Sequence, residues 1–149
     1  GMAGGQAIDL ASVGRTLDLA QLRRMHELKT GALLQASVLM GAACGAADAM
    51  ALRAPAWAAL ARYGAALGLA FQVVDDILDV TADSATLGKT AGKDAAHGKP
   101  TYVSLLGLAG AQAQAQQLLT EAQAALEASS LPDTRALAAL ADMVVCRSH

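Results

Sequence analysis

Hydrophobic and polar positions along this chain form long blocks, separated by short polar or glycine-rich segments. The blocks are rich in Ala and Leu, which are strong helix formers. Alternation of β-branched and polar residues, which would predict strands, does not develop into a run. The pattern therefore predicts an all-α protein, and we expect residues 1–149 to form a single all-α domain.

Helix-start signals divide the blocks into separate elements. Asp18 is a suitable N-cap, and Pro55 suits the first turn of a helix. The glycine-rich start, residues 1–15, is expected to be mostly loop or a short helix. With two further proline starts, we expect longer helices over residues 18–44, 55–81, 100–129 and 132–146.

The composition sets limits on core and partners. The chain has 149 residues, of which 54% are hydrophobic and only 3% aromatic, so an aliphatic core of Ala, Leu, Val and Met is expected. The net charge of −2 gives no overall basic character and argues against nucleic acid as a partner. Any anion must therefore bind at a local cluster of charges.

Two further features bear on the cellular setting. Cys44 and Cys146 are far apart and lack metal-ligand spacing, so we expect reduced, structural cysteines in a cytoplasmic protein. Residues 30–47 carry no charge and barely reach the length needed to cross a bilayer. We expect a buried helix there and no membrane span.

Three carboxylates fall close together near the end of the apolar block 55–81: Asp75, Asp76 and Asp79. On a helix, Asp75 and Asp79 share a face with Gln72 and are separated by about 6 Å along the axis, so both can reach one cation. Asp76 is rotated by about 100° and is expected to orient water, a lysine or another helix. Mg²⁺, which takes few carboxylates together with water and phosphate oxygens, fits this arrangement.

The alternative for the acidic cluster is a solvated helix end. Acids near a helix C-terminus oppose the helix dipole, which weakens that interpretation.

The polar segment 82–99 follows directly and contains three glycines and three lysines, Lys89, Lys93 and Lys99. Glycine-rich backbone and lysine side chains are suited to binding phosphate, although a solvated loop is the alternative. Beside the carboxylates, these lysines favour a metal–diphosphate site.

Taken in order, the motifs resemble the C-terminal half of a trans-prenyl diphosphate synthase, with bacterial farnesyl diphosphate synthases the closest match. The matching segments are residues 1–9, 26–34, 68–79, 86–94 and 98–102. The resemblance implies the isoprenoid-synthase helical bundle. It also implies a prenyltransferase that condenses dimethylallyl or geranyl diphosphate with isopentenyl diphosphate to give farnesyl diphosphate, and a cytoplasmic homodimer.

The same resemblance assigns roles to individual residues. Mg²⁺ holding the allylic diphosphate would be bound by Asp75, Asp79 and Asp76. The diphosphate itself would contact Lys29, Lys89 and Lys99. The catalytic groups would be Lys29, Thr30 and Gln72, of which Thr30 and Gln72 lie near the reacting carbon. Phe71, Gln6 and Asp9 would support the site.

Parts of the family's machinery are not found in this sequence, namely a first aspartate-rich motif and the residues that bind isopentenyl diphosphate. We therefore expect a C-terminal portion that is inactive alone. A geranylgeranyl diphosphate synthase and a non-catalytic regulatory subunit of a heteromeric synthase are the alternatives. The retained acids and lysines argue against the regulatory subunit. A terpene cyclase is weaker still, because its Asn/Ser/Glu metal motif is not found.

Overall fold

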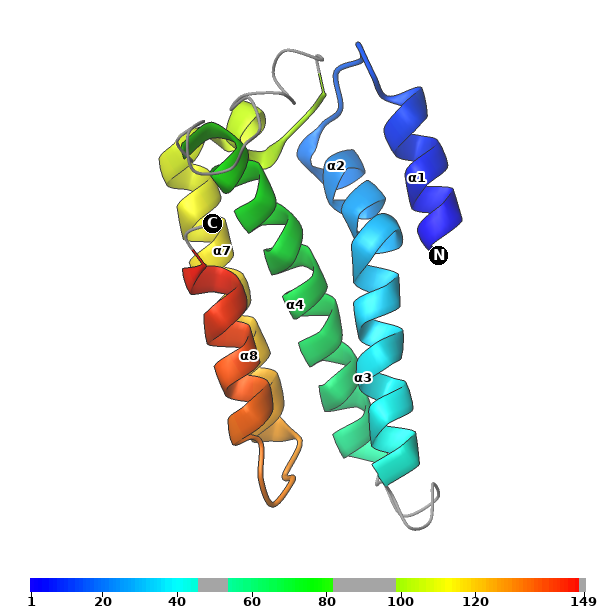
Figure 1. Ribbon diagram of the computed structural model, residues 1–149, viewed down its shortest axis with the longest axis vertical. Coiled ribbons are helices and arrows are strands. Elements are labelled where there is room, and N and C mark those ends of the chain that lie inside the picture. The colour runs from blue at the N-terminus through cyan, green and yellow to red at the C-terminus, as the bar shows by residue number, and fades with distance from the viewer. Residues whose placement is uncertain (46–53, 82–98, 148–149) are drawn as a thin grey trace.

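The computed structural model describes residues 1–45, 54–81 and 99–147, and the regular elements among them are all helical (Figure 1). This confirms the all-α prediction. The elements are α1 (Met2–Ala11), α2 (Leu19–His26), a π-helix η1 (Glu27–Gly31), α3 (Ala32–Gly45), α4 (Ala54–Thr81), α7 (Tyr102–Ala128) and α8 (Arg135–Cys146).

Helix α4 lies at the centre of the bundle. Figure 1 shows α3 on one side of it and α7 and α8 on the other, while α1 lies outside α2 and η1. Its apolar residues join two core clusters, one with α2 and α7 and one with α7 and α8. An aliphatic core was expected, but the two largest fully buried side chains are Tyr63 and Tyr102.

The helix predicted over residues 18–44 is present and is built from α2, η1 and α3 in succession. Asp18 caps it as expected: its side chain accepts from the Gln21 backbone N–H at 2.8 Å, and the Gln21 side chain accepts from the Asp18 backbone N–H at 3.0 Å. These reciprocal bonds form a capping box, which satisfies donors that the first turn leaves open.

Two proline-marked helix starts differ from prediction. At the start of the chain, residues 2–11 form a ten-residue helix, which is one of the two forms expected there. Helix α7 begins at Tyr102 and α8 at Arg135, each two to three residues after its proline. Thr101 caps α7 through a reciprocal pair of bonds with Ser104, and this capping box fixes the start better than Pro100 does.

Close backbone contact joins α4 to the helix beside it. A Cβ added at Gly68 would lie 2.6 Å from the Gly31 Cα, and one at Gly64 would lie 2.8 Å from the Gln35 Cα. The Gln35 side chain also donates to the Ala61 carbonyl at 2.9 Å. These contacts hold η1, which carries Lys29 and Thr30, directly against the helix that carries the carboxylates.

Among the described residues, one helix is long and apolar enough to cross a membrane by length and composition, namely Pro55–Thr81 within α4. The mean hydropathy of its most apolar window is 1.2, and 61% of that window is buried inside the bundle. The core helix of a soluble protein gives the same result, so the finding is weak support for a span.

Candidate functional site

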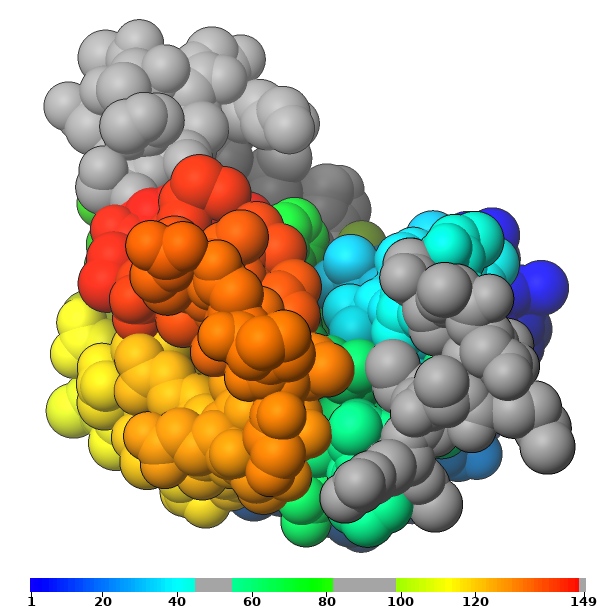
Figure 2. All heavy atoms as spheres, turned by 90° about the horizontal axis from the view of Figure 1, so that it is seen from below, coloured from blue at the N-terminus to red at the C-terminus, as the bar shows by residue number. Residues whose placement is uncertain are grey.

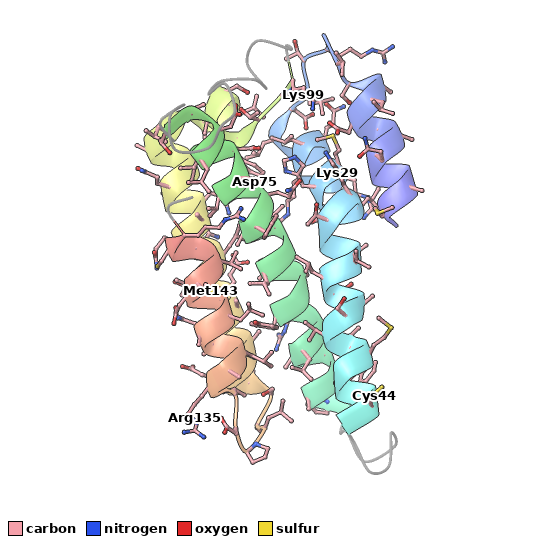
Figure 3. The ribbon with its side chains drawn as sticks, in the orientation of Figure 1. Lys29, Cys44, Asp75, Lys99, Arg135 and Met143 are labelled. Atoms are coloured by element: carbon pink, nitrogen blue, oxygen red, sulfur yellow. The ribbon has the colours of Figure 1, made fainter. Side chains whose placement is uncertain are left out.

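A cleft of about 390 Å³ lies at one end of the bundle, where α1, η1, α4 and the segment before α7 meet. Figure 3 shows Lys29, Asp75 and Lys99 gathered at this end, with Cys44 and Arg135 at the other. The predicted site residues that line the cleft are Asp9, Lys29, Gln72, Asp75, Asp76, Asp79 and Lys99. They come from distant parts of the sequence, so folding brings acids and lysines into one cavity.

Lys29 is held in place by the first helix. Its Nζ donates to Asp9 Oδ2 at 2.6 Å, and the Asp9 side chain is only 9% exposed. Helix α1 can approach this closely because Gly5 lies against the backbone of Leu28 and Lys29, where a Cβ would come within 2.5 Å of the Lys29 Cα. Gly5 is the second glycine of the segment Gly4-Gly5-Gln6, and it permits the contact between α1 and η1. Asp9 then fixes the position of Lys29.

Lys29 and Thr30 lie in the π-helical turn η1. The Ala32 N–H donates to the Glu27 carbonyl, five residues back rather than four. Such a turn inserts one extra residue into a helix, and π-turns frequently occur at functional sites. Here the extra residue changes the helical register between the buried His26 and the apolar helix α3.

The two neighbouring aspartates of α4 have different environments. The Asp75 side chain is 55% exposed, whereas Asp76 is buried at 8%. Asp76 Oδ2 accepts from the Tyr102 backbone N–H at 2.7 Å. Tyr102 is the first residue of α7, so this carboxylate satisfies an open N-terminal donor and lies at the favourable end of the helix dipole. Asp76 therefore orients a second helix.

Asp75 meets a residue from the far end of the chain. Arg147 Nη2 donates to Asp75 Oδ1 at 2.8 Å and to the Phe71 carbonyl oxygen at 2.9 Å. The guanidinium also lies 4.0 Å from the centroid of the Phe71 ring, in cation–π geometry. Arg147 lines the cleft together with the acids and lysines.

Arg147 is a cleft residue that the sequence analysis did not identify. It follows α8 and is 72 positions away from Asp75, so neither helical periodicity nor local spacing relates the two. The only indication in the sequence is a basic residue near the end of the chain, and this does not identify Asp75 as its partner.

The carboxylates suit a magnesium ion only as an open, partial site. Among the described residues, no group of three or more His, Cys, Asp or Glu side chains is arranged to hold a metal. Asp75 and Asp79 line the cleft one helical turn apart, and Asp76 is engaged with α7. Mg²⁺ commonly uses one or two carboxylates and completes its octahedron with water and substrate phosphates, so a pair of acids lining one cleft, Asp75 and Asp79, fits that ion.

Three predicted residues do not line the cleft: Thr30 and Phe71, which are half-buried, and Gln6, which is exposed on α1. Lys89 lies outside the described residues, as do Lys93, Gly88, Gly92 and Gly98.

Two buried aromatic groups support this end of the bundle. The rings of His26 and Tyr102 lie 5.7 Å apart, and both residues are buried. Burial raises the pKa of Tyr102 to about 12, so its phenol stays neutral at physiological pH. Tyr102 therefore adds a buried, uncharged ring beneath the charged residues.

An all-α bundle with acids and lysines lining a cleft at one end has the architecture of the isoprenoid-synthase class. The chain belongs to the polyprenyl synthetase family, whose model matches residues 1–137. The resemblance noted from the motifs is thereby confirmed.

Individual relatives agree with this assignment. A probable farnesyl diphosphate synthase of Sinorhizobium fredii is 55% identical over 126 residues, covering 85% of this chain and 38% of the relative. The farnesyl diphosphate synthase of Escherichia coli is 47% identical over 150 residues, covering 99% of this chain and 49% of the relative. This chain thus spans at most about half the length of these curated relatives.

A solved structure shows the same helical arrangement. The geranyltransferase of Helicobacter pylori, complexed with magnesium and isoprenyl diphosphate, superposes with a TM-score of 0.76 at 38% identity. The match covers 97% of this chain and 46% of that one. The helices described above therefore correspond to about half of a longer bundle.

Proposed function

We propose that this chain supplies the allylic-diphosphate half of a magnesium-dependent prenyltransferase. The complete enzyme would join dimethylallyl or geranyl diphosphate to isopentenyl diphosphate and yield farnesyl diphosphate. One observation carries the proposal: Asp75 and Asp79 line the same cleft as Lys29 and Lys99. Carboxylates for a cation and ammonium groups for phosphate are the two complementary halves of a metal–diphosphate site.

In this proposal the lysines bind the leaving group. Lys29 and Lys99 donate to diphosphate oxygens and offset the negative charge that grows as the allylic carbon–oxygen bond breaks. Asp9 keeps the Lys29 ammonium directed into the cleft through their 2.6 Å contact. A bound magnesium ion, held by Asp75 and Asp79, would add Lewis-acid stabilisation of the same oxygens.

Other residues act on the organic part of the substrate. Oxygen atoms of Thr30 and Gln72 would steady the allylic cation, and Phe71 would border the isoprenoid chain. Apolar side chains in the cleft wall, Met25 and Leu78, reduce access of water to that cation. Lys89 is proposed as a further phosphate ligand, and Gln6 supports α1.

The proposal predicts binding that depends on both the metal and the cleft residues. In the full protein that carries this sequence, calorimetry with a non-reactive geranyl thiolodiphosphate is expected to show binding only with Mg²⁺. Asp75→Ala and Lys29→Gln are each expected to weaken it by about tenfold to a hundredfold, because each removes a charge-assisted contact.

Asp133→Ala is the matched control, because that exposed aspartate pairs with Arg135 and lies outside the cleft. It is expected to bind like the wild type. Equal binding by all variants, or binding that does not require Mg²⁺, would remove the site. Product analysis of the full protein distinguishes farnesyl from geranylgeranyl chain length.

Three features of the whole enzyme also belong to the proposal: a homodimeric state, a cytoplasmic location without a membrane span, and dependence on the rest of the protein. The chain spans 38% of the Sinorhizobium relative, and we propose that alone it does not turn over substrate.

A further inference from the structure

Arg147 contacts the carboxylate of Asp75, which the proposed function assigns to a divalent cation. Its Nη2 lies 2.8 Å from Asp75 Oδ1, inside the cleft that also contains Asp79 and Lys99. The arginine neutralises an acid near the C-terminal end of α4, where the helix dipole disfavours negative charge. In this arrangement Arg147 performs the electrostatic task that is proposed for the metal.

Only part of the hydrogen-bonding capacity of the Arg147 guanidinium is used in this position. Its Nη2 serves two acceptors, Asp75 and the Phe71 carbonyl, and the guanidinium lies over the Phe71 ring. Its Nε, however, is buried without a hydrogen-bond partner among the described residues. A buried donor without a partner costs stability, so this docked position is weaker than a fork-like pairing of both atoms with one carboxylate.

The acid, by contrast, is accessible to an incoming ion. The Asp75 side chain is 55% exposed and that of Arg147 is 21% exposed. A divalent ion on Asp75 Oδ1 and a guanidinium on the same oxygen would repel each other. Binding of one therefore disfavours the other, and the C-terminal end of α8 is linked to the metal state of the cleft.

We propose that Arg147 is an exchangeable counter-ion of Asp75, displaced from the cleft when a divalent cation binds. The inference rests on the proposed function, because it takes Asp75 to be a metal ligand. In the metal-free state Arg147 keeps the cleft closer to neutral and ties the end of α8 to α4. On metal binding the arginine leaves, and the end of α8 loosens.

The test is a double-mutant cycle on Mn²⁺ binding to the full protein, with free Mn²⁺ measured by electron paramagnetic resonance. Arg147→Gln is expected to bind Mn²⁺ about three- to tenfold more tightly, the range expected for removing a partly exposed competing ion pair. In an Asp75→Asn background the same change is expected to have no effect. Arg147→Lys, which keeps the charge, is expected to stay close to the wild type.

Arg135→Gln is the matched control, since Arg135 begins the same helix but pairs with Asp133 at the opposite end of the bundle (Figure 3). It is expected to leave Mn²⁺ affinity unchanged. Unchanged or weaker binding by Arg147→Gln overturns the exchange. If Asp75→Asn itself does not weaken Mn²⁺ binding, the proposed metal site fails instead, which separates the two ideas.

A measurement on the unaltered protein covers the case in which Arg147→Gln does not fold. Hydrogen–deuterium exchange of the peptide that contains Val145, Cys146 and Arg147 is expected to become faster when Mg²⁺ is added. The peptide around Arg135 is expected to be unaffected. Slower or equal exchange at the Arg147 peptide would contradict displacement.

Discussion

Asp75 and Asp76 are neighbours in sequence, but they project from α4 in different directions and have different partners. A rotation of about 100° per residue places Asp75 at the surface of the cleft and Asp76 against the start of α7. The acids of such a cluster are therefore not interchangeable. Asp75 can exchange one cationic partner for another, whereas Asp76 fixes the position of a helix.

Tyr63 gives a residue-scale prediction on pH. Burial raises its pKa to about 12, above the ordinary value of 10.0, so the folded state holds the phenolic proton more tightly than the unfolded chain does. The associated stability is complete below pH 10 and is lost as pH rises towards 12. At pH 11 the loss from this group is expected to be about 1.4 kcal/mol.

Tyr63→Phe is expected to reduce the fall in unfolding free energy between pH 8 and pH 11 by that amount. At pH 8 it is expected to cost about 1 kcal/mol, because the Tyr63 hydroxyl donates to the Leu137 carbonyl at 2.8 Å. Urea unfolding at both pH values measures the two effects. Tyr102, with the same raised pKa, stays in both proteins, and an equal fall in both would contradict the prediction.

The role of a residue could be predicted from the sequence where it depends on neighbours along the chain. The acids of α4 follow from helical spacing, and Asp18 follows from its capping chemistry. Arg147 and the buried position of Tyr63 do not follow in this way. Each depends on which helices pack together, and the partners Asp75 and Leu137 lie more than 70 residues away.

At the scale of elements, the two glycines that begin the Gly-Gly-Gln segment are not equivalent. A Cβ at Gly4 would meet nothing within 4 Å, whereas one at Gly5 would strike the backbone of Lys29. The sequence pattern predicts mostly loop or a short helix for this segment and does not separate the two glycines. Helix α1 packs on η1, and the missing Cβ at Gly5 allows the two backbones to touch.

Gly5→Ala is therefore expected to push α1 away from η1 and to destabilise the protein by about 1–3 kcal/mol. It is also expected to weaken diphosphate binding, since Asp9 would no longer hold Lys29 at 2.6 Å. Gly4→Ala, in the same helix, is expected to be neutral or stabilising by about 0.5–1 kcal/mol. Thermal unfolding and calorimetry distinguish the pair, and equal effects would refute the role of Gly5.

Helix existence was easier to predict than helix irregularity. The long helices were anticipated because their apolar content and cap signals are local properties. The π-turn at residues 27–31 was not, because one extra residue leaves no mark in composition. Gly107 has a φ of 71° and interrupts α7. A single glycine in the sequence is not enough to predict such an interruption.

At the scale of the molecule, the described helices leave an apolar face uncovered. Leu33 and Met40 of α3 are 56% and 59% exposed. Beside them, a groove of about 550 Å³ runs between α3, α4 and α8, lined by Leu34, Val38, Leu60, Leu67, Leu137 and Leu140 among others. Figure 2 views the molecule from below, with the start of α8 in orange, the start of α4 in green and α3 in cyan on the right. A helix that is apolar on every side is expected to be buried.

The relatives are at least twice as long as the portion matched here, since the chain covers 38% and 49% of the two described above. In a protein of the relatives' length, we therefore expect the additional residues to cover the apolar face. The 149-residue chain alone is then expected to bind the dye ANS and to associate with increasing concentration, because large exposed apolar patches favour association. It is also expected to form no prenyl product from allylic and isopentenyl diphosphates.

Two methionines make a matched comparison. Met40 is on the uncovered face and Met143 is on α8 outside the groove, with exposures of 59% and 63%. Met40→Glu is expected to lower dye binding and association, whereas Met143→Glu is expected to change them little. In the full protein neither wild-type residue should give strong dye binding. If the 149-residue chain is monomeric and does not bind the dye, the prediction that its apolar face must be covered is wrong. If the chain alone forms prenyl product, the prediction that it depends on additional residues for activity is wrong.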